Sequence, residues 1–325
     1  MEEKKIFKVT SNPILRTPRG TRQIMLDVII GLIPALAVAV YMFGANVVLL
    51  LAVSIVSCVF FEWGYRKLMK KNSTVGDLSA VVTAILLVCV LPSEAKWWMV
   101  VIGSFFSVVV VKQLYGGIGK NFLNPALAGR AFLTAAYAGY MTVWAVPSVL
   151  SGAVDAATMA TPLSYLYSGQ PLPEHMGLGS IFLGGIPGSV GEISTLAVLI
   201  GGLWLLARKV ISWRIPAAYI GAVAVLTLVF SKGDDPMLWM LYSVMGGGVM
   251  LGAIFMATDY VTSPAMPAAQ LVYGVGCGVL TVIFRYFGLF PEGVTYAILI
   301  MNACAWALDK AVPVKRFGVK GGAGK

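Results

Sequence analysis

The sequence predicts an all-α polytopic membrane protein with about ten transmembrane helices. Of its 325 residues, 58% are hydrophobic and only 12% are charged, which is about half the charged fraction of an average soluble domain. The apolar residues gather in ten long stretches, and one motif of small residues and proline occurs twice. These observations predict two repeats of five helices each, with discontinuous helices near the repeated motif.

Ten apolar stretches are long enough to be candidate membrane spans, since a spanning helix needs about 20 mostly apolar residues. In chain order they cover residues 24–43, 46–64, 78–92, 97–115, 125–146, 190–207, 215–230, 237–256, 265–287 and 293–309. The third stretch is short and follows Gly76 and Asp77. It is therefore expected to be a tilted or discontinuous helix.

The distribution of basic residues predicts the orientation in the membrane. With the N-terminus inside and the helices alternating, 21 of the 24 Lys and Arg residues fall on the cytoplasmic side, and the outer side keeps only Lys96, Lys232 and Arg285. This asymmetry follows the positive-inside rule. It places the N-terminal segment 1–23, which lacks a cleavable signal, and the tail 310–325 in the cytoplasm. The net charge of +10 is thereby explained by topology, so lipid and not nucleic acid is the expected partner.

A repeated motif relates the two halves of the chain. The sequence NPALAGRAF at 124–132 aligns with SPAMPAAQL at 263–271, an offset of 139 residues. Asn124 and Ser263 are candidate helix N-caps, and each is followed by a proline at the first helical position. Paired segments of this kind in two halves indicate discontinuous helices around a central site.

The repeat divides the chain into two five-helix units. The first is expected over residues 24–146 and the second over residues 190–309, with a long outer loop at 147–189 between them. The small residues also have a simpler explanation, because glycines such as Gly274 and Gly278 permit close helix crossings without any central site.

The outer loop contains a segment whose residues suggest a modification site. Residues 151–163 read SGAVDAATMATPL, with Asp155 three places before Thr158 and six before Thr161, and with Ala160 between the two threonines. Short side chains leave a threonine oxygen reachable, and the proline after Thr161 opposes helix at that residue. The alternative is an ordinary loop in which Asp and Thr bond the local backbone.

This segment resembles the flavinylation motif Asp-x-x-Ser/Thr-x-Ala-Thr, whose last threonine, here Thr161, is esterified to the phosphate of FMN by a flavin transferase. Met159 departs from many relatives, which have glycine there. With ten helices, two repeats and cytoplasmic termini, nearly the whole chain, including residues 11–35, resembles the D subunits of Rnf complexes. It is similar also to the B subunits of sodium-pumping NADH:quinone oxidoreductases.

The resemblance implies an electron-carrying component of an ion-translocating oxidoreductase in the bacterial inner membrane, without a complete active site of its own. Rnf complexes transfer electrons between ferredoxin and NAD and couple this flow to Na⁺ or H⁺ translocation. The implied cofactors are FMN on Thr161, with Asp155, Thr158 and Ala160 as recognition elements, and a second, non-covalent flavin such as riboflavin. The implied partners are the other Rnf subunits, named G, A, E, C and B. The fold is related to that of urea transporters, so a solute channel without redox role is the alternative.

Four acidic residues stand near the ends of candidate helices: Asp27, Glu62, Glu192 and Asp259. Acidic residues inside a membrane are functional candidates by default, but here each lies close to an interface, where capping or snorkelling suffices. Glu62 has Arg66 four residues further on, a spacing at which an ion pair forms easily. No ion path is assigned to these four.

The four cysteines, Cys58, Cys89, Cys277 and Cys304, each lie inside an apolar stretch. None has the Cys-x-x-Cys spacing of a metal ligand pair. They are interpreted as small buried hydrophobic residues, and no metal site is expected.

Overall fold

The computed structural model describes residues 20–147, 158–173, 176–233, 235–288 and 293–312. Over this part of the chain the regular elements are helices, accompanied by two isolated β-bridges. The prediction of an all-α membrane protein is confirmed. Asp155 lies outside the described residues.

The helices occur in two groups along the chain. The first comprises α1 (Thr21–Phe43), α2 (Ala45–Leu68), η1 (Val75–Asp77), α3 (Ser79–Cys89), α4 (Trp97–Phe105), the π-helical η2 (Phe106–Gln113), α5 (Pro125–Ala136) and α6 (Ala138–Met141). The second comprises α7 (Pro162–Tyr167), α8 (Leu178–Leu183), α9 (Thr195–Ala207), α10 (Arg214–Val229), α11 (Pro236–Met245), α12 (Val249–Leu251), the π-helical η4 (Gly252–Met256), α13 (Pro267–Phe287) and α14 (Val294–Ala311).

The expected membrane segments take three different forms. Among the described residues, α1, α2 and α13 are each long and apolar enough to cross a membrane alone. Helix α11 and the α12–η4 segment form one pair bent by 57°, while α3, α4–η2, α9 and α10 are shorter apolar helices. The expected span at 125–146 is divided between α5 and α6. The protein is therefore a multi-pass membrane protein in which several helices are discontinuous.

The first copy of the repeated motif begins a helix as predicted. The side-chain oxygen of Asn124 accepts hydrogen bonds from the backbone N–H groups of Ala126 and Leu127, and Pro125 is the first helical residue of α5. The amide of the same side chain donates to the carbonyl of Met256, 3.3 Å away. One residue therefore caps α5 and joins the two halves of the chain.

The second copy behaves differently, and the prediction of a cap at Ser263 is wrong. Helix α13 begins at Pro267 and follows Met266. The carboxylate of Asp309, on α14, accepts hydrogen bonds from the N–H groups of Ala265 and Met266 at 2.9 and 3.0 Å. Because a side chain from another helix satisfies these N–H groups, the helix starts later.

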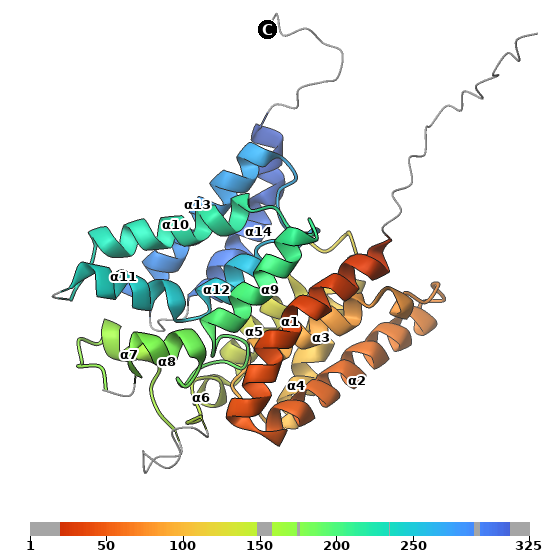
Figure 1. Ribbon diagram of the computed structural model, residues 1–325. Coiled ribbons are helices and arrows are strands. Elements are labelled where there is room, and N and C mark those ends of the chain that lie inside the picture. Colours follow the sequence, from red (N-terminus) through yellow and green to blue (C-terminus); the bar gives the residue numbers. More distant parts are fainter. Residues whose placement is uncertain (1–19, 148–157, 174–175, 234, 289–292, 313–325) are drawn as a thin grey trace, which may run out of the picture.

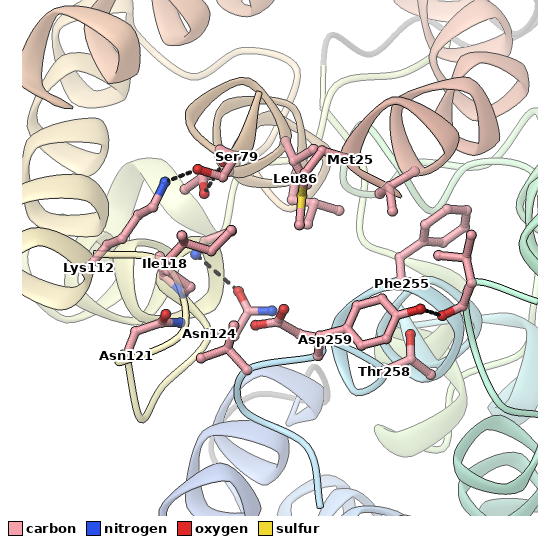
Figure 2. Close-up of a pocket in the computed structure, with 18 of the residues that line it drawn as sticks. Met25, Ser79, Leu86, Lys112, Ile118, Asn121, Asn124, Phe255, Thr258 and Asp259 are labelled. Atoms are coloured by element: carbon pink, nitrogen blue, oxygen red, sulfur yellow. Dashed lines mark hydrogen bonds between the residues drawn. The ribbon is translucent and has the colours of Figure 1, made fainter. Parts of the chain in front are cut away.

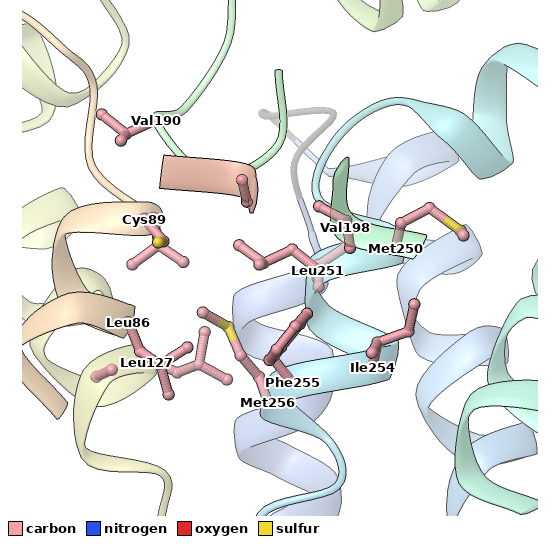
Figure 3. Packing of buried hydrophobic residues seen from close by; sticks show 14 of the residues in the cluster. Leu86, Cys89, Leu127, Val190, Val198, Met250, Leu251, Ile254, Phe255 and Met256 are labelled. Carbon is pink, nitrogen blue, oxygen red and sulfur yellow. The ribbon is translucent and has the colours of Figure 1, made fainter. Parts of the chain in front are cut away.

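The core of the bundle lies between α3, α5 and the α12–η4 segment. Leu86, Cys89, Leu127, Leu251 and Phe255 are buried there (Figure 3). Lipid tails are as apolar as these side chains, so the hydrophobic effect contributes little to helix association inside a membrane. Close packing between the helices must stabilise their association instead.

Glycines provide that close packing at two crossings. A Cβ atom on Gly201 of α9 would stand 1.9 Å from the carbonyl oxygen of Gly31 on α1, so the two backbones touch. On α13, a Cβ on Gly274 would stand 2.7 Å from the Cβ of Ala218 on α10. A Cβ on Gly278 would stand 2.6 Å from the Cβ of Ala222 on the same helix. The packing explanation offered for the Gly274 and Gly278 pair is confirmed.

Three cysteines are buried as predicted, namely Cys58, Cys89 and Cys277. The prediction is wrong for Cys304, which is exposed on α14. This helix packs mainly on α13, and one of its faces is left uncovered by the rest of the chain.

The segment expected as an outer loop is partly helical. It contains α7 and α8, which lie with α6 at one end of the molecule, away from the beginning of α1 and the end of α14 (Figure 1). We call the end that carries α6, α7 and α8 the loop end. Gly184 and Gly185 have φ values of 110° and 133°, and these left-handed residues turn the chain toward α9.

Candidate functional site

Thr161 stands immediately before α7. Its backbone is extended, with φ −70° and ψ 154°, and Pro162 is the first helical residue. Proline disfavours helical backbone at the residue before it, so the helix cannot begin earlier. The Thr161 Oγ1 atom accepts a hydrogen bond from the Ser164 N–H at 3.3 Å. Thr161 is therefore the N-cap of α7.

The two threonines of the motif differ in exposure. Thr161 is only 6% exposed, whereas Thr158 and Ala160 are exposed to solvent. Thr158 pairs with Ala145 in a short antiparallel bridge, and the N–H of Met159 donates to the carbonyl of Trp144 at 3.1 Å. The expectation of a freely reachable hydroxyl therefore fits Thr158 and is wrong for Thr161, because capping and helix packing enclose the Thr161 side chain.

Helix α7 rests on an aromatic cluster at the loop end. The ring of Tyr167 lies 5.2 Å from the rings of both Trp239 and Tyr286, measured between centroids. The indole N–H of Trp239 donates to the Tyr286 hydroxyl at 3.1 Å. An open groove lined by residues 166–172 and by Lys232 and Trp239 runs beside this cluster. The groove offers ring surfaces next to the segment that carries Thr161.

The break between α11 and α12 lies against the start of α7. Gly247 and Gly248 have left-handed backbones, with φ 64° and 73°. A Cβ on Gly247 would stand 2.6 Å from Leu163 Cδ2 on one side and 2.6 Å from Arg285 Nη2 on the other. Only glycine fits between these two side chains. The guanidinium group therefore approaches the first turn of α7 through the broken helix.

The described residues at the loop end fit a phosphate-linked flavin in three respects. Thr161 supplies a hydroxyl to which a phosphate ester could be joined. The Nε of Arg285 is a buried donor without a hydrogen-bond partner, as expected where an anionic acceptor is still to come. The aromatic groove provides apolar surface of the kind on which flavin rings pack.

A second pocket lies deeper in the bundle, between α1, α3, α5 and the segment after η4 (Figure 2). Its walls combine apolar residues such as Leu86 and Phe255 with polar groups from Asn121, Asn124 and Asp259. Burial raises the pKa of the Asp259 carboxyl above its usual value, and hydrogen bonds to that carboxyl act in the opposite direction. A mixed lining of this kind is typical of a small-molecule site.

The four acidic residues are more buried than the sequence suggested. Asp27, Glu62 and Glu192 are buried, and only Asp259 is partly exposed. Glu192 also does not open a helix as expected, because α9 starts at Thr195. The Glu192 carboxylate accepts a hydrogen bond from the nearby Ser189 N–H at 2.8 Å. The position of these residues near an interface stays a prediction.

The predicted pair of Glu62 with Arg66 is wrong. Glu62, which is fully buried, accepts a hydrogen bond from Lys112 Nζ at 2.7 Å and one from the Thr74 hydroxyl at 2.6 Å. Arg66 instead donates to the side chain of Gln113 at 3.2 Å. The helical spacing allowed the local pair, but packing of η2 against α2 brings a lysine from another helix closer.

Two functional candidates were missed by sequence reasoning. Lys112 and Arg285 were counted only as charges that orient the chain, yet each is 3% exposed. The signal was present, because each is a single basic residue close to the end of a long apolar run. A buried basic residue in a membrane helix needs a partner, and Lys112 finds one in Glu62 at 2.7 Å. In the Asp27–Arg208 pair, at 3.1 Å, it is the acid that is buried, since Arg208 is 44% exposed.

Comparison with known proteins relates nearly the whole chain to one family. A sequence model of the NQR2, RnfD, RnfE family matches residues 8–318. The chain is 45% identical, over 313 residues, to the D subunit of the Na(+)-translocating ferredoxin:NAD(+) oxidoreductase complex of Acetobacterium woodii. The alignment covers 96% of this chain and 95% of that protein.

Two further relatives give the same result. The D subunit of the proton-translocating ferredoxin:NAD(+) oxidoreductase complex of Clostridium ljungdahlii is 38% identical, with 98% of both chains covered. The D subunit of the ion-translocating oxidoreductase complex of Shewanella amazonensis is 37% identical, with 97% of this chain and 99% of that protein covered. The chain belongs to the NQR2, RnfD, RnfE family.

Proposed function

We propose that this chain is the membrane-embedded D subunit of an Rnf-type complex and carries electrons through FMN covalently attached to Thr161. The complex would transfer electrons between ferredoxin and NAD⁺ and couple this flow to Na⁺ or H⁺ translocation, as the names of the relatives describe. The observation that supports the attachment site is the position of Thr161, a hydroxyl fixed by Pro162 at the start of α7.

The attachment requires an activated form of FMN, which a flavin dinucleotide provides. Thr161 Oγ1 forms a new bond to the FMN phosphorus, and the pyrophosphate P–O bond of the dinucleotide breaks. A nucleoside monophosphate leaves, and the hydroxyl proton passes to a base of the flavin transferase. No electrons are exchanged in this step. Because Thr161 is 6% exposed, the transferase must meet this segment before α7 packs on α11.

The other residues of the motif are assigned to recognition. Thr158 and Ala160 are exposed, so an enzyme can contact them, and Asp155 belongs to the same segment. Flavin supplies one-electron and two-electron steps, while the protein supplies position and electrostatics. In this chain, the ester at Thr161 would fix the position, and the aromatic cluster of Tyr167, Trp239 and Tyr286 would exclude water from one side.

The deeper pocket is proposed as the place of a second, non-covalent flavin such as riboflavin. The amide of Asn121 and the carboxyl of Asp259 are hydrogen-bonding groups of the kind that the edge of a flavin ring requires, and Leu86 and Phe255 give the pocket apolar walls. The pocket also joins the two halves, since Asn124 bonds across to η4.

The remaining assignments concern the surroundings of the protein. We assign it to the bacterial inner membrane with both termini cytoplasmic and the loop end outside. The partners would be the other Rnf subunits, named G, A, E, C and B, with a flavin transferase acting during maturation. One relative is named for Na⁺ and another for protons, so both ions belong in any transport assay.

The attachment site is tested by expressing the chain together with a flavin transferase and comparing Thr161→Asn with Thr161→Ser. Asparagine is a good N-cap but cannot form a phosphate ester, and serine keeps both abilities. We expect a fluorescent band on a denaturing gel, and the mass of one esterified FMN, for the natural chain and for Thr161→Ser. Thr161→Asn should be dark while its thermal stability stays close to that of the natural chain purified without the transferase.

Two results would contradict the proposal. Label retained in Thr161→Asn but lost in Thr158→Val would move the attachment to the exposed threonine. If the natural chain carries no covalent flavin in a transferase-competent host, the proposed electron-carrier function is contradicted. A solute channel without redox role would then be the better interpretation. Acid precipitation of the same preparation separates the two cofactors, since only a non-covalent flavin would appear in the supernatant.

A further inference from the structure

Arg285 is a buried cation whose contacts among the described residues are carbonyl oxygens. It lies in the last turn of α13 and is 3% exposed. Its guanidinium donates hydrogen bonds to three carbonyl oxygens, those of Ser243, Gly246 (3.0 Å) and Gly247 (3.3 Å). These belong to the end of α11 and the break that follows it. Among the described residues no carboxylate pairs with Arg285.

The hydrogen bonds solvate this charge without neutralising it. Carbonyl groups at a helix end carry only a partial negative charge, equivalent to about half an electron for the whole helix. The Nε atom of Arg285 remains buried without an acceptor, although a guanidinium can donate five hydrogen bonds. Buried charges in membrane proteins are costly and are normally paired. The arrangement therefore leaves one buried donor of Arg285 for a further, anionic acceptor.

The position of Arg285 identifies where that anion would come from. Gly247 separates Arg285 from Leu163, and a Cβ at Gly247 would be 2.6 Å from both side chains. Leu163 is the second residue of α7 and comes two residues after Thr161. Arg285 and Thr161 therefore lie near the same turn of α7, with the guanidinium on the far side of Gly247 from Leu163.

We propose that Arg285 is the counter-charge of the phosphodiester that links FMN to Thr161. This inference rests on the proposed attachment of FMN. A phosphodiester keeps one negative charge at neutral pH, and an arginine guanidinium matches phosphate oxygens in both charge and geometry. Arg285 is a positioning residue, because it holds the linker and does not touch the reacting ring.

Two consequences follow from this charge pair. The anchored phosphate holds the flavin against α7 and the break between α11 and α12, which fixes its distance from the next electron carrier. The arginine also offsets the negative charge of the linker. Without Arg285, the uncompensated charge would disfavour electron uptake, so the reduction potential of the flavin would shift to a more negative value.

The test measures how the flavin and Arg285 influence each other in full-length protein purified with and without the flavin transferase. In the natural chain, attachment should raise the unfolding temperature by several degrees, because the phosphate satisfies the buried cation. In Arg285→Gln the same attachment should give a clearly smaller rise, a faster-rotating flavin by fluorescence anisotropy, and a more negative potential. Arg285→Lys should restore the potential, because the positive charge is kept.

Lys310→Gln serves as the matched control, since it removes one exposed positive charge from α14, away from the loop end. It should leave all three readings unchanged. If Arg285→Gln does not accumulate, the stability gain and the anisotropy are measured in Arg285→Lys, which cannot form a bidentate contact and should lose part of both. Equal gains and equal potentials in the natural chain and in the Arg285 variants would overturn the inference. An unlabelled natural chain would instead contradict the attachment itself.

Discussion

The Oγ1 atom of Thr161 caps α7 and is also the proposed attachment point of the cofactor. The two roles are compatible. After esterification, the charged phosphate oxygens can accept the hydrogen bond from the Ser164 N–H in place of Oγ1, because they are stronger acceptors. The capping geometry also keeps the side chain in a single orientation. A flavin attached there would start from a fixed point at the loop end.

A second feature at the residue scale is the buried pair of Glu62 and Lys112. Glu62→Gln would leave the lysine charge buried without its partner, and such losses cost about 3–5 kcal/mol in the free energy of unfolding. We expect this loss in thermal or denaturant unfolding of the detergent-solubilised protein. The double variant Glu62→Met with Lys112→Met should recover most of it, because no charge remains buried. Additive losses from the two substitutions would show that the pair does not act as a unit.

At the scale of helices, small residues decide how closely the elements approach. Helices α1 and α9 meet through Gly31 and Gly201, with no room for a Cβ between them. Gly247 has the same role at the break, where it lets the Arg285 guanidinium reach α7. Broken helices tolerate such contacts because nearby side chains satisfy the backbone groups that the break exposes.

The crossing of α1 and α9 gives a prediction at this scale. Gly201→Val would force the two backbones apart, and overpacking of this kind costs about 1–3 kcal/mol in the free energy of unfolding. Gly221→Ala on α10 is the control, because a Cβ there meets nothing within 4 Å. It should leave the unfolding temperature unchanged or slightly raised. If both variants unfold at the temperature of the natural chain, the close crossing does not contribute to stability.

At the scale of the whole molecule, aromatic and basic residues lie together at the C-terminal ends of three helices. A basic side chain lies over a tryptophan ring four residues before it in the last turns of three helices, α2, α9 and α14: Lys67 over Trp63, Arg208 over Trp204 and Lys310 over Trp306. Tryptophan with lysine or arginine is the usual composition of a cytoplasmic membrane boundary. This supports a topology in which these three helices end inside and the loop end faces outside.

The topology predicts which positions an impermeant thiol reagent can reach in intact cells. In a Cys304→Ser background, which removes the exposed cysteine, Gln170→Cys in the groove beside α7 should react from outside. Asn72→Cys, in the exposed turn after α2, should react only after the membrane is made permeable. The opposite pattern would overturn the orientation and place the flavin loop in the cytoplasm.

Much of the architecture follows from local rules and could be predicted from the sequence. The apolar stretches specify a helical membrane protein, because every backbone group must be satisfied within the lipid. Asn124 and Pro125 start α5, and Pro162 fixes the start of α7, since capping and the restriction before proline act over a few residues. The expected division into two five-helix repeats stays a prediction.

Tertiary structure alone decided the features that depend on residues far apart in the chain. Glu62 pairs with a lysine 50 residues away and not with Arg66 four residues away. Asp309, on the neighbouring helix α14, bonds the N–H groups before α13 from more than 40 residues away in the chain. Burial of Thr161 and the approach of Arg285 to α7 also require packed helices. Charge partners and exposure are properties of the assembled bundle, because they depend on which surfaces meet. The order of residues determines only which surfaces exist.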